Sequence, residues 1–178
     1  ECYKYVYVLC ASTNLERICA LSKVVPRGKY FICDEHQNKL IELLQNRWQR
    51  YSPLYRNIKK TVYHERILSR FQKRGFLMMV RDNQKFREII RKFDSEQGII
   101  LYSMWDGYRT KPNSTIPEFL KLTKQWDTLH TSGHASVNDI EMVIEKTKPS
   151  IIIPIHTICP EELQELCPNQ RVLLLEDG

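Results

Sequence analysis

Short apolar runs alternate with helical patterns along most of this chain, and this alternation constrains the fold more than any other feature. The runs at residues 5–11, 29–33, 76–80 and 99–104 read YVYVLCA, KYFIC, FLMMV and IILYSM. Their apolar residues are continuous, which is typical of strands buried on both faces of a parallel sheet. The helical patterns between them therefore predict an α/β fold in which helices cover both faces of that sheet.

Residues that favour helix ends set the expected boundaries of these helices. Side chains that accept hydrogen bonds from a first helical turn precede three of them: Ser12, Thr13 or Asn14, then Asp34, then Asp82. Gly75 is expected to end a helix over 65–74. Residues 115–125 carry a further helical pattern, whereas 51–61 and 106–114 are expected to be irregular.

A second segment begins near residue 126, and we expect two domains, at 1–125 and 126–178. Ser136 and Asp139 predict a capping box at the start of a helix that Pro149 ends. The rest of this segment is expected to hold two buried strands and a short helix: 151–155, 172–175 and 160–166.

Positive charge is concentrated in the first segment. Residues 1–126 hold 24 Lys and Arg against 12 Asp and Glu, whereas residues 127–178 hold 3 against 9. The positive electrostatic field of such a segment favours a phosphate-rich partner such as nucleic acid. The alternative is that these charges only solvate the exposed faces of helices. The candidate phosphate contacts and stacking rings are Arg47, Arg50, Arg56, Lys59, Lys60, Arg70, Lys73 and Arg74, with Tyr51, Tyr55 and Tyr63.

Composition also bears on location. No run approaches the ~18 apolar residues of a membrane span, and residues 1–20 lack the pattern of a signal peptide. The six cysteines form no C-x-x-C pair and lie mostly in apolar segments. We therefore expect a cytoplasmic protein that has no membrane partner and no disulfide framework.

The stretch HTSGH at residues 130–134 has the chemistry of an anion site. Thr131 and Ser132 supply hydroxyl donors, and Gly133 allows the backbone to approach a ligand closely. His130 and His134 flank these residues, and an imidazole donates a hydrogen bond or a proton to an anionic oxygen.

His156 follows the apolar run IIIPI, and a neutral imidazole at the end of a strand is a good metal ligand. A single histidine is more often a buried or capping side chain with a satisfied hydrogen bond. Three of the chain's five histidines within 27 residues weaken that alternative, which is kept for His36 and His64.

Taken together, LHTSGHAS, KPSIIIPIHT and RVLLLEDG resemble the C-terminal part of the β-CASP metallo-β-lactamase nucleases, the group of ribonuclease J and the mRNA 3′-end cleavage endonucleases. The 22 positions between His134 and His156 are similar to the spacing of two signature histidines in that family. YVYVLCASTNLERI is similar to the start of the family's β-CASP insert. The resemblance implies a parallel-sheet β-CASP-like domain followed by the C-terminal strand–helix segment of a metallo-β-lactamase fold.

The resemblance also implies roles for individual residues. His156 would be a ligand of a catalytic zinc pair, and His134 would contact the scissile phosphate or protonate the leaving group. His130, Thr131, Ser132 and Gly133 would hold a substrate phosphate. A metal-bound hydroxide would be the nucleophile for cleavage of nucleic acid, with RNA as the leading substrate.

Two features depart from the family pattern. His156 is followed by Thr157 and Ile158 where the family often has H-G-E, and no H-x-H occurs anywhere in the sequence. The metal-binding H-x-H-x-D-H motif belongs to an N-terminal half of the hydrolase, so we expect that half as a partner and expect this chain to be a fragment. Apolar surface left by its absence would favour a homodimer. A non-catalytic phosphate-binding module and a hydrolase of small substrates remain as alternatives.

The first prediction concerns the metal ligands. Each zinc ion needs roughly four ligands, so the 178-residue chain alone is expected to bind zinc weakly and to leave single-stranded RNA intact. Zinc content by mass spectrometry and a gel assay of RNA cleavage check this. Stoichiometric, tightly held zinc together with turnover would contradict it.

Overall fold

The computed structural model describes residues 3–129, 135–155, 157 and 159–175. It divides the chain into two compact units, Glu1–Thr131 and Ser132–Gly178. The strand Gln125–Thr128, at the start of the expected second segment, pairs within the first unit. The assignment of 1–125 and 126–178 to two domain families stays a prediction.

In its described part, the first unit forms a six-stranded sheet with the order β3-β2-β4-β1-β5-β6. Every pairing in this sheet is parallel. Its strands are β1 Tyr5–Leu9, β2 Tyr30–Cys33, β3 Thr61–Val62, β4 Phe76–Val80, β5 Gly98–Tyr102 and β6 Gln125–Thr128. The expected parallel α/β fold is therefore confirmed.

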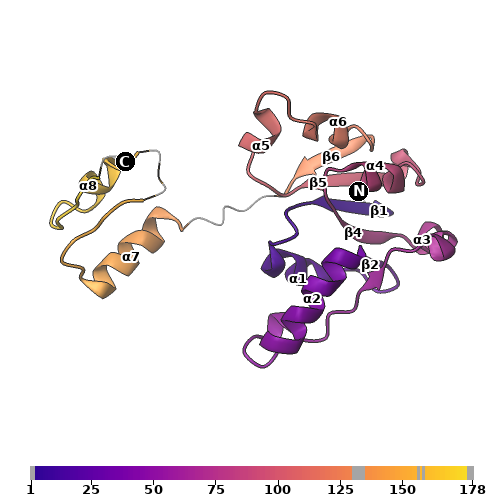
Figure 1. The fold of residues 1–178 in the computed structure, drawn as a ribbon, viewed down its shortest axis with the longest axis horizontal. Helices are drawn as coiled ribbons and strands as arrows, with labels where there is room; N and C mark the ends of the chain where they lie inside the picture. Colours follow the sequence, from indigo (N-terminus) through magenta and orange to yellow (C-terminus); the bar gives the residue numbers. More distant parts are fainter. Residues whose placement is uncertain (1–2, 130–134, 156, 158, 176–178) are drawn as a thin grey trace. The chain divides into compact units, whose positions relative to one another are not determined.

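The helices lie in the connections between these strands (Figure 1). They are α1 Leu15–Lys23, α2 Glu35–Trp48, α3 Leu68–Arg74, α4 Gln84–Ile90, α5 Gly107–Thr110 and α6 Ile116–Leu120. Short 3-10 helices add η1 Pro53–Tyr55, η2 Glu65–Ile67 and η3 Ser95–Gln97.

Side-chain alternation along β1 divides the core into two layers. Tyr5, Tyr7 and Leu9 face a cluster that includes side chains of α3, α4 and α6. Val8 faces a second cluster, which includes Ile18 of α1 and Ile41 of α2. Because both faces are covered, the central strands are almost wholly buried, which explains their continuous apolar sequence.

Most of the expected helix starts agree with the structure. The Asn14 side chain accepts a hydrogen bond from the Arg17 N–H, and Asp34 accepts one from the Gln37 N–H at 2.9 Å. The expectation for Asp82 is wrong, since Asn83 caps α4 by accepting from the Phe86 N–H at 3.1 Å.

Asp82 instead pairs with other parts of the unit. The Arg87 guanidinium lies 2.5 Å from the Asp82 carboxylate, and the Thr115 hydroxyl donates to its second oxygen at 2.6 Å. A carboxylate next to a helix start can cap that helix or pair with side chains of other elements. Sequence spacing alone does not distinguish these two roles.

The two segments expected to be irregular contain some regular structure. Residues 51–61 include η1 and the first residue of β3, and residues 106–114 include the short helix α5. The helix expected over 115–125 is shorter, because α6 ends at Leu120 and Gln125 begins β6.

The second unit contains α7 Val137–Thr147 and α8 Glu162–Leu166. The expected capping box is confirmed: Ser136 Oγ accepts from the Asp139 N–H at 3.2 Å, and the Asp139 carboxylate accepts from the Ser136 N–H at 3.1 Å. The buried strands expected over 151–155 and 172–175 are wrong. The described part of these segments pairs through a single parallel bridge, between Ile152 and Val172.

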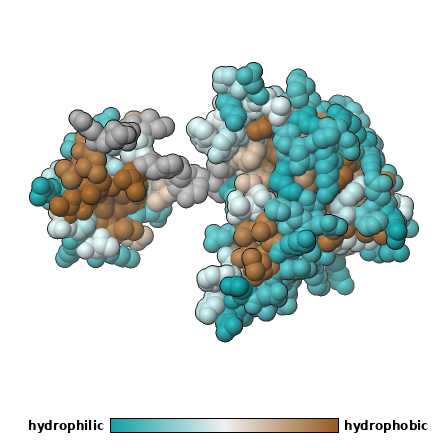
Figure 2. All heavy atoms as spheres, viewed as in Figure 1, coloured by the Kyte–Doolittle hydropathy of each residue, from teal (hydrophilic) through white to brown (hydrophobic). Residues whose placement is uncertain are grey.

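Those two segments are exposed because the described residues of the second unit form no sheet that would cover them. The exposed fraction of the Ile155 side chain is 80%. Figure 2 shows the resulting hydrophobic surface on this unit. The exposed aliphatic side chains are Val137, Met142, Val143, Ile151, Ile153, Ile155, Leu173, Leu174 and Leu175. None of the helices in the described ranges has the length and apolar character that a membrane crossing requires.

Two thiols of the first unit behave as core side chains. Burial raises the pKa of Cys10 to about 11 and that of Cys33 to about 12, despite nearby positive charges. A thiol with so high a pKa carries little thiolate at neutral pH, so these cysteines are poor nucleophiles and poor metal ligands.

Gly75 and Gly28 give a matched test of the sheet's closest backbone approach. Both have positive φ, at 75° and 94°, but a Cβ on Gly75 would lie 2.4 Å from the Lys4 carbonyl oxygen, whereas one on Gly28 meets nothing within 4 Å. Gly75→Ala is therefore expected to lower the free energy of unfolding by about 3 kcal/mol or more, and Gly28→Ala by about 1 kcal/mol. Urea denaturation checks this, and equal losses in both variants would contradict it.

Candidate functional site

Neighbouring strands lead to opposite faces of the sheet at several places along its carboxyl edge, and two of these places hold buried polar side chains. β1 leads to α1 on one face, while its neighbour β5 leads to α5 and α6, and α6 packs on the other. β2 and β4 diverge in the same way, toward α2 and α4. Ligands of open parallel sheets bind in the crevices that such divergence creates, so this edge is the first candidate site.

Ser103 joins three segments at the first of these places. Its hydroxyl donates to the Leu129 carbonyl at 2.5 Å and accepts from Arg17 Nη1 at 2.8 Å. The same Arg17 nitrogen donates to the Ser103 carbonyl at 3.2 Å, and the Leu129 N–H donates to the Tyr102 carbonyl at 2.8 Å. Leu129 precedes His130 in the chain, so the approach to the HTSGH stretch is fixed at the carboxyl edge.

Asp34 occupies the second place and holds a buried ion pair. The Arg81 guanidinium lies 2.5 Å from its carboxylate and the Lys85 ammonium 3.7 Å away. Burial would raise the pKa of Asp34, but the hydrogen bonds from the Gln37 N–H and Arg81, with the charges of Arg81 and Lys85, outweigh it and lower that pKa. Asp34 is therefore a structural anion that ties β2 to the end of β4.

The predicted site residues His130, Thr131, Ser132, Gly133, His134 and His156 lie outside the described residues. Their roles in phosphate and metal binding stay predictions. The segment immediately after His134 is described, and its Ser136 capping box starts α7.

The described histidines have other surroundings. His64 Nδ1 accepts a hydrogen bond from the Arg66 N–H at 3.1 Å and caps η2, and His36 is exposed on α2. Within the ranges that the structure describes, no three His, Cys, Asp or Glu side chains lie close enough to hold a metal ion. Those residues therefore do not fit a zinc pair by themselves.

A basic surface lies at the opposite, amino-terminal edge of the sheet, around the start of β2. Shallow hollows there adjoin one another: Tyr30 lines one neighbouring pair of them, and Lys29 and Lys59 line another pair. No acidic side chain is among the described residues that line these hollows. We call this the amino-edge basic surface, and its cationic residues are Lys23, Arg27, Lys29, Lys59, Lys60, Arg70, Lys73 and Arg74.

Five of the sequence-predicted cations lie on this surface, and three do not. Arg47 and Arg50 lie at the carboxyl end of α2, and Arg56 Nε donates to the Gln49 carbonyl there at 2.6 Å. Lys23, Arg27 and Lys29 were not predicted because they lie far from the densest basic stretch in sequence. The sequence signal that could have identified them is their position in the turn just before the strand Tyr30–Cys33, at the amino end of that strand.

The predicted stacking tyrosines have different surroundings. Tyr63 packs parallel to Phe71, with ring centroids 6.0 Å apart, and its hydroxyl is buried. Tyr55 packs against the layer formed with α1 and α2. Tyr51 is exposed and packs against Trp48, so it alone of the three keeps an accessible ring.

The Asp34 ion pair predicts how stability depends on pH. Since the folded pKa lies below the unfolded one, the pair's contribution is present above about pH 4 and is lost as the pH falls through the folded pKa. Asp34→Asn keeps a good helix cap but leaves Arg81 without its carboxylate, so we expect a loss of about 2 kcal/mol at pH 7. The free energy of unfolding of Asp34→Asn should also fall less steeply below about pH 4 than that of the unaltered chain.

Urea denaturation between pH 2 and pH 8 measures both effects. Asp94→Asn is the matched control, because Asp94 is also a capping carboxylate with a lowered pKa but is fully exposed. Equal pH dependence in Asp34→Asn and the unaltered chain would show that the pair does not stabilise the fold.

Comparison with known protein families identifies one segment of the chain. Residues 125–167 match the family described as Zn-dependent metallo-hydrolase RNA specificity domain. A search of curated proteins gives no match. The matched segment begins at β6 and includes the HTSGH stretch, α7 and His156. It supports the metallo-β-lactamase superfamily for this part of the chain, as the resemblance implies.

Proposed function

We propose that the chain is part of a zinc-dependent metallo-hydrolase that cleaves phosphodiester bonds in RNA. The match of residues 125–167 to an RNA specificity domain of zinc-dependent metallo-hydrolases carries this proposal. The first unit is proposed to be a β-CASP-like domain, which its parallel sheet with covered faces supports.

The roles proposed for the site follow the resemblance. His156 is a zinc ligand, His134 contacts the scissile phosphate or the leaving group, and residues 130–133 hold a substrate phosphate. The further zinc ligands are proposed to come from an H-x-H-x-D-H motif in a partner half of the hydrolase. The exposed aliphatic surface of the second unit supports such a partner, with self-association into a homodimer as the alternative.

The amino-edge basic surface is proposed to bind the RNA backbone. Arg70, Lys73 and Arg74 come from one turn of α3 and its end, all three are exposed, and the Arg74 guanidinium lies 5.8 Å from the centre of the Tyr30 ring. An extended basic surface suits a polymer of phosphates better than a small ester, because each contact with a phosphate releases counterions.

A non-catalytic RNA-binding module is the second candidate, and the same basic surface favours it. The two candidates differ in chemistry. Joined to a segment that carries the H-x-H-x-D-H motif, the chain should cleave RNA in the presence of zinc, and His134→Ala should abolish cleavage while leaving binding unchanged. Binding without cleavage in that joined protein would favour the module.

Charge reversal tests the basic surface directly. The triple variant Arg70→Glu, Lys73→Glu and Arg74→Glu should bind a single-stranded adenylate 10-mer at least tenfold more weakly. The plot of log K against log salt concentration should lose about 2 units of slope, since each lost phosphate contact removes about 0.7. Fluorescence anisotropy at several salt concentrations measures both values.

The matched control reverses three lysines that already pair with carboxylates. Lys92, Lys121 and Lys124 lie close to Glu65, Glu118 and Glu96, respectively, in the same unit. Their triple reversal changes the net charge equally but should leave most of the binding intact. Equal losses in the two triple variants would indicate a general charge effect and would contradict a specific surface.

A further inference from the structure

Three large aromatic side chains are exposed together near the carboxyl edge of the first unit. The exposed fractions are 62% for Trp105, 49% for Tyr108 and 43% for Trp126. They come from three segments: the turn after β5, the helix α5 and the strand β6. Exposed aromatic groups that gather in this way mark interaction sites more often than isolated ones do.

Two cations lie over these rings. The Arg109 guanidinium is 5.4 Å from the centre of the Trp126 ring, and the Lys111 ammonium is 5.8 Å from the centre of the Tyr108 ring. Trp105 and Tyr108 pack edge to face, with centroids 5.5 Å apart and an interplanar angle of 86°. We call Trp105, Tyr108, Arg109 and Trp126 the aromatic platform.

The backbone of the platform is fixed from inside the unit. The buried Tyr102 hydroxyl donates to the Trp105 carbonyl at 2.7 Å, and the same carbonyl accepts from the Tyr108 N–H at 3.1 Å. The Asp106 carboxylate accepts from Arg109 Nε at 2.8 Å, and Arg109 Nη2 lies 2.7 Å from the same oxygen. Side chains that are held before a ligand arrives lose little conformational entropy when it binds.

Gly107 is the residue that allows Trp105 this position. A Cβ at Gly107 would lie 2.3 Å from Cη2 and Cζ3 of the Trp105 indole and 2.6 Å from Cζ2. Real Cβ atoms do not approach ring carbons so closely, so any side chain at position 107 would displace the indole. The backbone of Gly107 does not need positive φ, and alanine therefore fits the chain path itself.

The chemistry of the platform favours a nucleobase. Aromatic rings and guanidinium planes stack on bases regardless of their sequence, and alternation of rings with cations is typical of surfaces that bind single-stranded nucleic acid. Because Asp106 neutralises Arg109, its guanidinium serves as a flat stacking surface more than as a phosphate contact. β6, which carries Trp126, leads toward the predicted phosphate site at 130–134.

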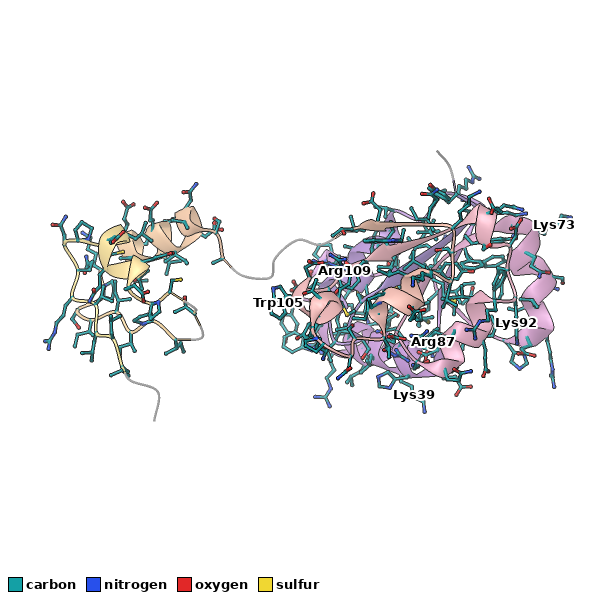
Figure 3. All side chains as sticks on the ribbon, turned by 90° about the horizontal axis from the view of Figure 1, so that it is seen from above. Lys39, Lys73, Arg87, Lys92, Trp105 and Arg109 are labelled. Atoms are coloured by element: carbon teal, nitrogen blue, oxygen red, sulfur yellow. The ribbon has the colours of Figure 1, made fainter. Side chains whose placement is uncertain are left out.

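We infer that the aromatic platform binds an unpaired base of single-stranded RNA, an inference that rests on the proposed function. Figure 3 shows Trp105 and Arg109 at one end of the unit and Lys73, on the amino-edge basic surface, at the other. The aromatic platform therefore contacts RNA bases at one end of the first unit, and the amino-edge basic surface contacts the RNA backbone at the other end.

Two oligomers of equal charge test this inference: a single-stranded adenylate 10-mer and an abasic 10-mer with the same phosphates. The chain should bind the adenylate oligomer about tenfold more tightly, and tryptophan fluorescence should be quenched by that oligomer alone. Gly107→Ala, which displaces the Trp105 indole, should bind both oligomers with the affinity of the abasic one. Trp105→Ala gives the same result by removing an exposed side chain, should the first variant fold poorly.

Trp48→Ala is the matched control. Trp48 is also exposed and also packs against a tyrosine, but it lies at the end of α2, away from the platform. Its variant should keep the tenfold preference for the adenylate oligomer. A loss in Trp48→Ala as large as that in Trp105→Ala would overturn the inference.

The remaining outcomes separate the platform from the proposed function. Equal binding of both oligomers by the unaltered chain would overturn the platform and leave backbone binding standing. Failure to bind either oligomer would remove the proposed RNA partner and the platform with it. A change of oligomeric state in Gly107→Ala, seen by sedimentation with no change in oligomer binding, would identify the rings as a protein interface and overturn the inference.

Discussion

Burial of the parallel sheet on both faces is the constraint on which the rest of the first unit depends. The strands β1 and β4 contribute side chains to both core layers, so the connections must supply helices to both. A right-handed crossover places each helix according to the direction in which the chain moves along the sheet. Neighbouring strands therefore diverge at the carboxyl edge, and Ser103 and Asp34 lie at two of these divergences.

Polar groups at this edge hold the unit together. Ser103 is buried and links the ends of β5 and β6 with α1, while the Asp34 ion pair links the ends of β2 and β4. A buried carboxylate is tolerated there because Arg81, Lys85 and the Gln37 N–H compensate for the water that it loses. Ser103 thus anchors the chain at Leu129, one residue before the predicted phosphate site.

The parts of this fold that could be predicted are those encoded by neighbouring residues in the sequence. Strands β1, β2, β4 and β5 are continuous apolar runs, and caps such as Asn14 and Ser136 act within one helical turn. β3 has two residues and depends on pairing with β2, so sequence alone does not indicate it. The runs at 151–155 and 172–175 have the composition of buried strands, but burial requires a covering sheet that the described residues do not provide.

The candidate site residues also divide into those that local sequence identifies and those that only the fold brings together. The HTSGH stretch and His156 are contiguous motifs, so spacing and resemblance identify them without any structure. The amino-edge basic surface instead combines Lys29 with Lys73, and the aromatic platform combines Trp105 with Trp126. The residues of each pair are distant in sequence, and the folding of the sheet brings them to one surface. Gly107 is the extreme case, because a glycine after an aspartate predicts a turn and gives no sign of the indole packed against it.

In the proposed function, two chemically different surfaces at opposite ends of the first unit would divide the recognition of RNA between them. Phosphate contacts on the amino-edge basic surface are independent of base and weaken steeply with salt, whereas stacking on the aromatic platform is largely insensitive to salt and requires an unpaired base. A structured duplex satisfies the first surface and not the second, because its bases are already stacked. Under this proposal, the two surfaces together would select single-stranded segments before any chemistry at the predicted phosphate site.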